Sequence, residues 1–260
     1  MVIGLRWIGH ATTLVEMDGV RLLTDPLLVG YLTLVVQRRA PGVVDFGRLA
    51  VPDAVLISHA HHDHMHLPSL RLLPKGTLLL VPEGTGHWLE RRGFGNVEEL
   101  AIGGTFDVGA IRVHATPAVH QGTRVPFGPT AATLGFVVEG SERVYFAGDT
   151  DLFPEMEDIP RAAGGPLDLA LLPVGGWGPT LRGGHMDPQR AAASLRLLRP
   201  RAAIPIHWGT FWPRGLALVR PYRFHLPGAA FFEAAAVAAP DVDVRVLAPG
   251  EEVDLHEGAG

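Results

Sequence analysis

The chain has 260 residues, a net charge of −5 and no cysteine. Its length suits one large domain, and an apolar fraction of 47% is enough for a sizeable core. The acidic balance argues against the basic surface of a nucleic-acid-binding protein, and the lack of cysteine excludes disulfide bonds, thiolate metal ligands and a cysteine nucleophile.

The N-terminal residues 1–7 have a strand pattern and lack the basic and apolar regions of a signal peptide. The longest candidate for a membrane segment, 27–36, is shorter than the roughly 18 apolar residues that a spanning helix needs. We therefore expect a single cytoplasmic domain over residues 1–260, without an integral membrane segment. The expected partner is a small-molecule substrate and not nucleic acid; a homo-oligomer is compatible with the sequence but cannot be read from it.

Strand patterns dominate the chain, with helices interspersed. Met17-Asp18-Gly19 joins two apolar runs, and Asp-Gly is a strong hairpin signal because both residues tolerate positive φ. Asp187-Pro188 opens an alanine-rich helix with a favoured N-cap and first residue. We expect strands at 11–16, 20–24, 53–57, 77–81, 105–115, 132–138, 143–147, 168–173, 202–206 and 243–248, helices from 68, at 85–92, from 188 and at 227–239, and a loop or flap at 27–50. Layered sheets with outer helices are the natural architecture.

A histidine cluster follows the strand predicted at 53–57. His59, His61, Asp63 and His64 have the spacing H-x-H-x-D-H. In extended backbone His59 and His61 point the same way and could bind one ion, whereas Asp63 and His64 come as the chain turns into a helix and could face a second ion. These donors suit zinc, iron or manganese. The alternative is a solvated histidine-rich loop, but the position directly after a buried strand favours a metal site.

Three further candidates, His120, Asp149 and His207, lie after other apolar strands. Each alone is a weak signal, because a lone histidine is more often structural and Gly148-Asp149-Thr150 could form only an Asx turn. Their shared placement at strand ends favours convergence on the histidine cluster.

The chain resembles the metallo-β-lactamase-fold hydrolases along almost its whole length. The residues that carry the resemblance are the candidates above together with Asp25, in this order along the sequence. Other segments resemble the branch that contains N-acyl-phosphatidylethanolamine-hydrolysing phospholipase D and the ascorbate-6-phosphate lactonase group. These segments are WIGHAT (7–12), LTDP (23–26), FAGDT (146–150), HMDP (185–188) and IHWGTF (206–211). The resemblance implies an α/β (α+β) fold, a four-layer αββα sandwich with two metals at one edge.

The resemblance also implies a ligand set for two divalent metal ions, with zinc expected and manganese or iron(II) as alternatives. The first ion would be held by His59, His61 and His120, and the second by Asp63, His64 and His207, with Asp149 bridging. Asp25 would hold a ligand through a hydrogen bond. His10 would do the same, or would have only a buried structural role.

The chemistry implied by such a site is hydrolysis. A hydroxide shared by the two metals would attack a carbonyl carbon or a phosphorus, since metal binding lowers the pKa of water to about 7. Asp63 could also orient this nucleophile. His185 is predicted to donate to the leaving group or the developing oxyanion, against the alternative of a surface histidine. His61 favours hydrolysis over oxygen chemistry, because the diiron oxidoreductases of this fold carry glutamate at that position.

The substrate is less determined. The segment 27–45 is expected to overhang the site, with apolar residues lining a pocket and Arg38 and Arg39 meeting a phosphate; packing on the core with a solvated arginine pair is an equal alternative. A second candidate lining is aromatic: Trp177, Trp208, Phe211 and Trp212. The first hypothesis is a phosphodiesterase, the second a lactonase or carboxylic-ester hydrolase, and the third a non-catalytic metal-binding protein. The remaining histidines (62, 66, 87, 114, 225 and 256) are interpreted as surface or structural residues.

Overall fold

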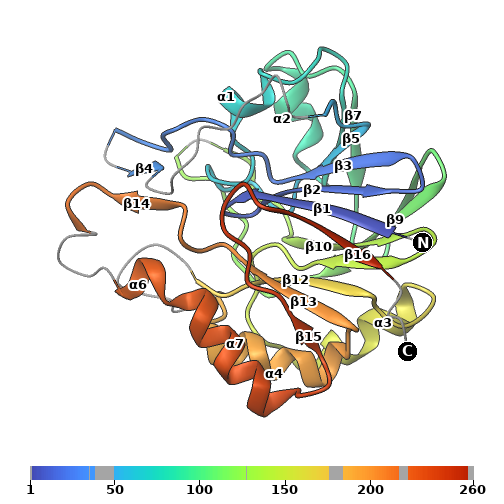
Figure 1. Cartoon of the computed structure of the whole chain (residues 1–260). Helices are drawn as coiled ribbons and strands as arrows, with labels where there is room; N and C mark the ends of the chain where they lie inside the picture. Colours follow the sequence, from blue (N-terminus) through green and yellow to red (C-terminus); the bar gives the residue numbers. More distant parts are fainter. Residues whose placement is uncertain are drawn as a thin grey trace.

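The computed structural model describes residues 2–34, 36–38, 50–126, 128–175, 184–216 and 222–256. Within these ranges two seven-stranded sheets lie face to face, and helices cover their outer faces (Figure 1). This arrangement confirms the predicted four-layer αββα sandwich.

The first sheet combines an antiparallel and a parallel half. In order across the sheet it contains β16 (Glu252–His256), β1 (Val2–Gly9), β2 (Thr12–Met17), β3 (Val20–Thr24), β5 (Ala54–Leu56), β6 (Leu78–Pro82) and β7 (Val97–Leu100). The strands from β3 to β7 are parallel. The predicted hairpin between β2 and β3 is confirmed, because Asp18 and Gly19 have φ values of 52° and 79°.

The second sheet has a similar division. It contains, in order, β15 (Asp243–Val244), β13 (Ala202–Ile206), β12 (Leu169–Pro173), β11 (Arg143–Phe146), β10 (Leu134–Glu139), β9 (Ile111–Pro117) and β8 (Thr105–Val108). The prediction of one strand at 105–115 is wrong. The chain turns at Gly109, where φ is 57°, and Val108 pairs with Ile111. The strand predicted at 243–248 ends at Val244.

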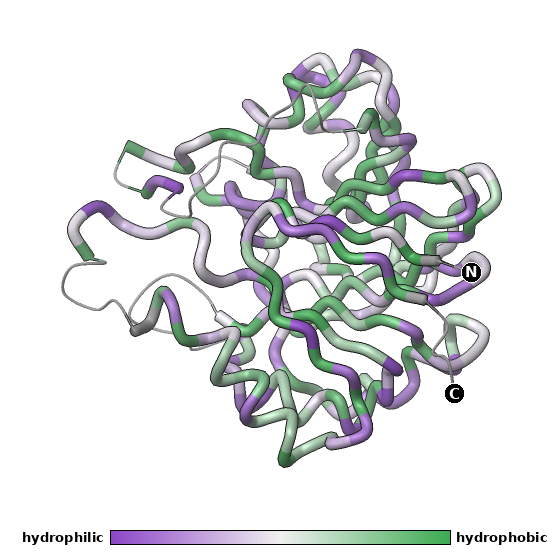
Figure 2. Tube along the Cα trace, viewed as in Figure 1, coloured by the Kyte–Doolittle hydropathy of each residue, from purple (hydrophilic) through white to green (hydrophobic). Residues whose placement is uncertain are grey.

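Apolar side chains fill three layers. Trp7, Phe136 and Phe146 belong to the core between the sheets. Outside the second sheet, Phe231 belongs to a cluster beneath the helices, and Leu89 belongs to the corresponding cluster outside the first sheet. The helices are α1 (Leu67–Leu70), α2 (Gly86–Glu90), η1 (Pro154–Asp158), α3 (Ile159–Ala162), α4 (Pro188–Leu198), α6 (Tyr222–His225) and α7 (Pro227–Ala238). Figure 2 shows hydrophobic stretches along the strands in the middle of the molecule.

Helix α4 begins as the sequence predicts, because the Asp187 side chain accepts a hydrogen bond from the Arg190 backbone N–H at 2.8 Å. None of the helices in the described ranges has both the length and the apolar character needed to cross a membrane.

Part of the predicted flap forms a two-stranded ribbon, β4 (Val36–Arg38) with β14 (Phe211–Pro213), which lies away from the two termini in Figure 1. Arg38 donates to the backbone oxygens of Ile8 and Leu27 at 3.2 and 3.4 Å, and its guanidinium lies 5.1 Å from the centroid of the Phe211 ring. These contacts favour a packing role for Arg38 over a phosphate contact. Arg39 lies outside the described residues.

Candidate metal centre

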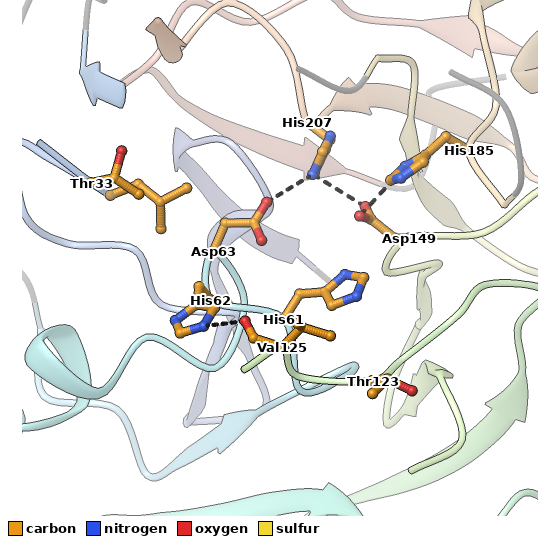
Figure 3. Close-up of a pocket in the computed structure, with 10 residues that line it drawn as sticks. Thr33, His61, His62, Asp63, Thr123, Val125, Asp149, His185 and His207 are labelled. Carbon is orange, nitrogen blue, oxygen red and sulfur yellow. Dashed lines mark hydrogen bonds and ion pairs between the residues drawn. The ribbon is translucent and has the colours of Figure 1, made fainter. Parts of the chain in front are cut away.

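The predicted site residues gather at one edge of the sandwich, because strands that run parallel end on the same side. Asp25 follows β3, the histidine motif follows β5, and Asp149 follows β11. His120 and His207 come shortly after β9 and β13. In Figure 3 the side chains of His61, Asp63, Asp149, His185 and His207 point toward a common centre.

Three imidazoles form the first cluster. His61 Nδ1 lies 2.9 Å from His59 Nε2 and 3.1 Å from His120 Nε2. Ligand atoms of a tetrahedral zinc ion, with bonds of about 2.0–2.1 Å, lie roughly 3.3 Å from one another. The three nitrogens therefore have nearly the spacing that one divalent cation requires.

The second cluster contains carboxylates as well as imidazoles. Asp149 Oδ2 lies 3.2 Å from His64 Nε2, and Asp149 Oδ1 lies 3.2 Å from His207 Nε2. Asp63 Oδ2 lies 3.6 Å from His64 Nε2 and 3.8 Å from His207 Nε2. Asp149 Oδ2 is also 4.0 Å from His59 Nε2, so this carboxylate stands between the two clusters.

Several of these atoms are buried without a hydrogen bond. His64 Nε2, His207 Nε2 and Asp149 Oδ1 have no hydrogen-bond partner among the described residues. Buried polar atoms normally find a partner, since leaving one unpaired costs roughly 1–3 kcal/mol. A cation at the centre of the cluster would satisfy all three atoms, so the residues fit a metal site.

Asp25 is hydrogen-bonded to His64 and to Ser58. Its Oδ2 accepts hydrogen bonds from His64 Nδ1–H and from the Ser58 hydroxyl, both at 2.6 Å, and its Oδ1 accepts from the Ser58 backbone N–H at 2.7 Å. The Ser58 oxygen in turn lies 2.9 Å from His59 Nδ1. Asp25 and Ser58 thus direct the Nε2 atoms of His64 and His59 into the site. No pattern in the sequence singles out Ser58 as a candidate residue.

Asp25→Asn should weaken metal binding by about 10–100-fold, the usual cost of losing a hydrogen bond to a metal ligand. The asparagine side chain has only one acceptor oxygen, whereas the Asp25 carboxylate accepts hydrogen bonds from three donors. Competition with a chelator measures this affinity. Asp53→Asn is the control, because Asp53 bonds the Arg21 backbone N–H in an exposed position. Equal chelator resistance in the two variants would contradict the role of Asp25.

Backbone carbonyls orient two other candidate ligands. His120 Nδ1 lies 2.8 Å from the Gly184 oxygen, and His207 Nδ1 lies 2.8 Å from the Gly175 oxygen. The Nδ1–H groups donate to these carbonyls, which leaves each Nε2 free to face the cluster. Gly184 has φ of 95°, and a Cβ on it would lie 2.9 Å from His120 Cα, so no other residue fits there without a shift.

His10 contacts the second cluster. Its Nε2 lies 3.0 Å from Asp63 Oδ2, and its backbone oxygen accepts from the His207 N–H at 2.8 Å. Burial, together with His207, lowers the pKa of His10 to about 4, so the neutral ring donates to Asp63. His10, Asp25 and His207 have φ of 56°, 31° and 64°, a region that costs a non-glycine residue about 1–3 kcal/mol. Such strain is typical of functional sites.

The two clusters differ in electrostatics. Burial lowers the pKa of His59, His61 and His120, which keeps these imidazoles in the neutral form that binds metals. For His64 and His207, burial lowers the pKa, but nearby carboxylates together outweigh it and the pKa is raised: Asp149, Asp25 and Asp63 act on His64, and Asp149 and Asp63 act on His207. Burial raises the pKa of Asp149, but the neighbouring histidines, chiefly His207 and His64, outweigh this effect and hold the pKa well below its usual value. The second cluster therefore favours bound positive charge.

A cavity of about 540 Å³ opens over both clusters (Figure 3). It is lined by Leu32, Thr33, His61, His62, Asp63, Thr123, Val125, Asp149, His185 and His207. His185 Nδ1 lies 3.6 Å from Asp149 Oδ2, and burial lowers the pKa of this histidine. The structure thus places His185 beside the clusters and on the cavity wall.

The cavity lining differs from the sequence predictions. Within 27–36, Leu32 lines the cavity, but Leu27 and Leu28 are buried in the core. The predicted aromatic lining is wrong for Phe211, Trp212 and Trp208; the Trp208 ring stacks on Trp7 with centroids 5.4 Å apart. Trp177 lies outside the described residues. His62, interpreted as a surface or structural residue, is part of the cavity wall.

Comparison with known proteins identifies the family. Residues 20–208 match the family described as Beta-lactamase superfamily domain. The chain belongs to the metallo-β-lactamase superfamily. Within it, a UPF0173 metal-dependent hydrolase of Methanopyrus kandleri is 34% identical over 257 residues, which cover 96% of this chain and 99% of that protein. A protein of the same name from Deinococcus radiodurans is 34% identical over 255 residues, with 96% and 99% covered.

A solved structure gives the same result. Igni18, a metallo hydrolase from Ignicoccus hospitalis, superposes with a TM-score of 0.76 at 27% identity, covering 99% of this chain and 100% of that one. This chain is accordingly a metal-dependent hydrolase of the metallo-β-lactamase superfamily, with histidine and aspartate clusters suited to metal binding.

Proposed function

We propose that this metallo-β-lactamase-superfamily protein is a dinuclear hydrolase. The observation that carries the proposal is the position of Asp149, whose two carboxylate oxygens lie 3.2 Å from ligand nitrogens of the second cluster while one of them also approaches the first. One ion would be held by His59, His61 and His120, and the other by Asp63, His64 and His207, with Asp149 bridging. Zinc suits this nitrogen-rich set best, with manganese or iron(II) as alternatives.

When bound, the two cations lower the pKa of a water molecule and stabilise the negative charge that develops on the substrate. The protein supplies position and proton transfer. Asp149 would set the spacing of the ions, and Asp63, held by His10, would orient the attacking water. His185 would donate a proton to the leaving oxygen from the cavity wall.

The proposed substrate is a small phosphodiester. Two divalent cations with the carboxylates of Asp63 and Asp149 leave a net positive charge at the site, which suits the single negative charge of a diester. No arginine or lysine is among the described residues that line the cavity, whereas a doubly charged phosphomonoester is usually met by such residues. The resemblance to the branch that contains a phospholipase D agrees with this choice.

A lactone or another carboxylic ester is the second candidate. Leu32, Thr33, Thr123 and Val125 give the cavity a neutral wall, which accepts an uncharged substrate as readily as a diester. The same branch contains a lactonase group.

Rates on bis(p-nitrophenyl) phosphate and on a panel of lactones distinguish these candidates. The protein is stripped of metal with a chelator and then loaded with zinc or manganese. We expect metal-dependent hydrolysis of the diester at a higher kcat/KM than any lactone. The reverse order would favour the second candidate. Failure of the fully metallated protein to hydrolyse either class would contradict both candidates and favour a non-catalytic metal-binding protein.

A further inference from the structure

Arg124 is a buried cation close to the metal centre. Its relative exposure is 6%, and it lies in the segment between His120 and β10. No carboxylate pairs with it among the described residues; its side chain donates to backbone oxygens and to a histidine ring. Burial lowers its pKa to about 10, so the guanidinium is still charged at neutral pH. Burying a charge costs free energy unless hydrogen bonds compensate for it, so the groups that this guanidinium contacts indicate its role.

The guanidinium bonds both ends of the turn that carries the motif. Its Nη1 donates to the backbone oxygens of Ala60 and Met65, both at 2.9 Å. Between these two residues lie His61, which belongs to the first cluster, and Asp63 and His64, which belong to the second. One planar group with fixed donor geometry therefore holds the distance between the ends of the ligand-bearing turn.

The same guanidinium joins two walls of the cavity. Its Nη2 donates to His62 Nδ1 at 3.0 Å, so His62 carries its proton on Nε2 and donates to the Val125 oxygen at 3.1 Å (Figure 3). The Arg124 backbone N–H bonds the Pro129 oxygen at 3.0 Å and closes the loop behind it. His62 and Val125 both line the cavity.

Trp88 contacts both Arg124 and a second arginine. The Arg124 guanidinium carbon lies 5.0 Å from the centroid of the Trp88 ring, and that of Arg92 lies 3.5 Å from it. Arg92 is exposed and donates to the Trp88 backbone oxygen at 2.9 Å, so it shares the aromatic contact without reaching the motif turn. It is a matched control for loss of an arginine beside Trp88.

We propose that Arg124 is a positioning residue of the active site. It holds the turn from Ala60 to Met65 in the shape that presents His61 to one ion and Asp63 to the other, and through His62 it fixes the wall that contains Val125. The proposal rests on the proposed dinuclear function, but metal affinity tests it separately from turnover.

The test compares Arg124→Met with Arg92→Met. Zinc affinity is measured by chelator competition and the fold by circular dichroism. We expect Arg124→Met to bind zinc about 10–100-fold more weakly, as for other residues that orient ligands, and Arg92→Met to stay within about twofold of the wild type. Wild-type affinity in a folded Arg124→Met protein overturns the proposal. This result does not depend on substrate, so failure of the phosphodiester assay leaves it unaffected.

Chemical rescue provides the second measurement. Arg124→Ala leaves a space the size of a guanidinium, and millimolar guanidinium chloride should restore much of its zinc affinity without raising that of Arg92→Ala. Loss of affinity that guanidinium does not restore in a folded protein overturns the proposal. If neither Arg124→Met nor Arg124→Ala folds, Arg124→Lys provides the test. The lysine ammonium lacks the planar fork of the guanidinium, so we expect zinc binding to be at least about threefold weaker. Unchanged zinc affinity in Arg124→Lys overturns the proposal.

Discussion

Replacing Asp149 with alanine should abolish hydrolysis and reduce the amount of bound metal. The carboxylate has an oxygen 3.2 Å from His64 Nε2 and another 3.2 Å from His207 Nε2, and it reaches toward His59. Without this carboxylate, both ions would lose the ligand that they share. Loss of a residue that only orients a ligand costs about 10–100-fold, so loss of this ligand should cost more than about 100-fold in kcat/KM. Metal counts by mass spectrometry and steady-state rates measure both effects.

Asp151→Ala is the control for this variant. Asp151 lies two residues further along the same segment, but it pairs with Arg190 at 2.5 Å and is not among the residues that line the cavity. It should keep its metal and at least half its activity. Full activity in a metal-depleted Asp149→Ala protein would contradict the dinuclear account.

His185→Ala should keep both metals and lose turnover. His185 lies on the cavity wall with Nδ1 3.6 Å from Asp149 Oδ2, where it can donate to a leaving group. General acid catalysis contributes about 10²–10⁴-fold, so kcat should fall by that factor with a diester of an alkyl alcohol. With p-nitrophenolate, which leaves without a proton, the loss should be much smaller.

The dependence on the leaving group separates proton donation from a structural role. Damage to the site would lower the rate equally for both kinds of substrate. His87→Ala is the control, because 81% of the His87 side chain is exposed and it is not part of the cavity wall. Kinetics in His185→Ala that match those of His87→Ala would make His185 a surface histidine.

The positions of the candidate ligands could be predicted because the signals are local. Each ligand follows an apolar strand, and the H-x-H-x-D-H spacing fixes four of them within six residues. Ser58 and Arg124, which contact the segments that carry these candidate ligands, have no such signal. Ser58 meets Asp25 across 33 positions of sequence, and Arg124 meets Ala60 across 64. Only the fold brings these partners together.

The missed strands are explained by their positions in the sheets. β7 (Val97–Leu100) and β16 (Glu252–His256) are edge strands with charged residues, so they lack the continuous apolar run of a central strand. The hairpin from β8 to β9 was predicted as one strand because Val108-Gly109-Ala110-Ile111 is apolar throughout. The aromatic prediction failed because ring type does not reveal direction: Trp208 packs on Trp7 and not on the cavity.

The most direct test of a dinuclear centre is a crystal structure of the zinc-loaded protein with anomalous scattering recorded at the zinc edge. We expect two ions per chain. One should be bound by His59, His61 and His120, the other by Asp63, His64 and His207, each at about 2.0–2.2 Å, with Asp149 touching both. A single ion at full occupancy, or two ions of which only one contacts Asp149, would contradict the account.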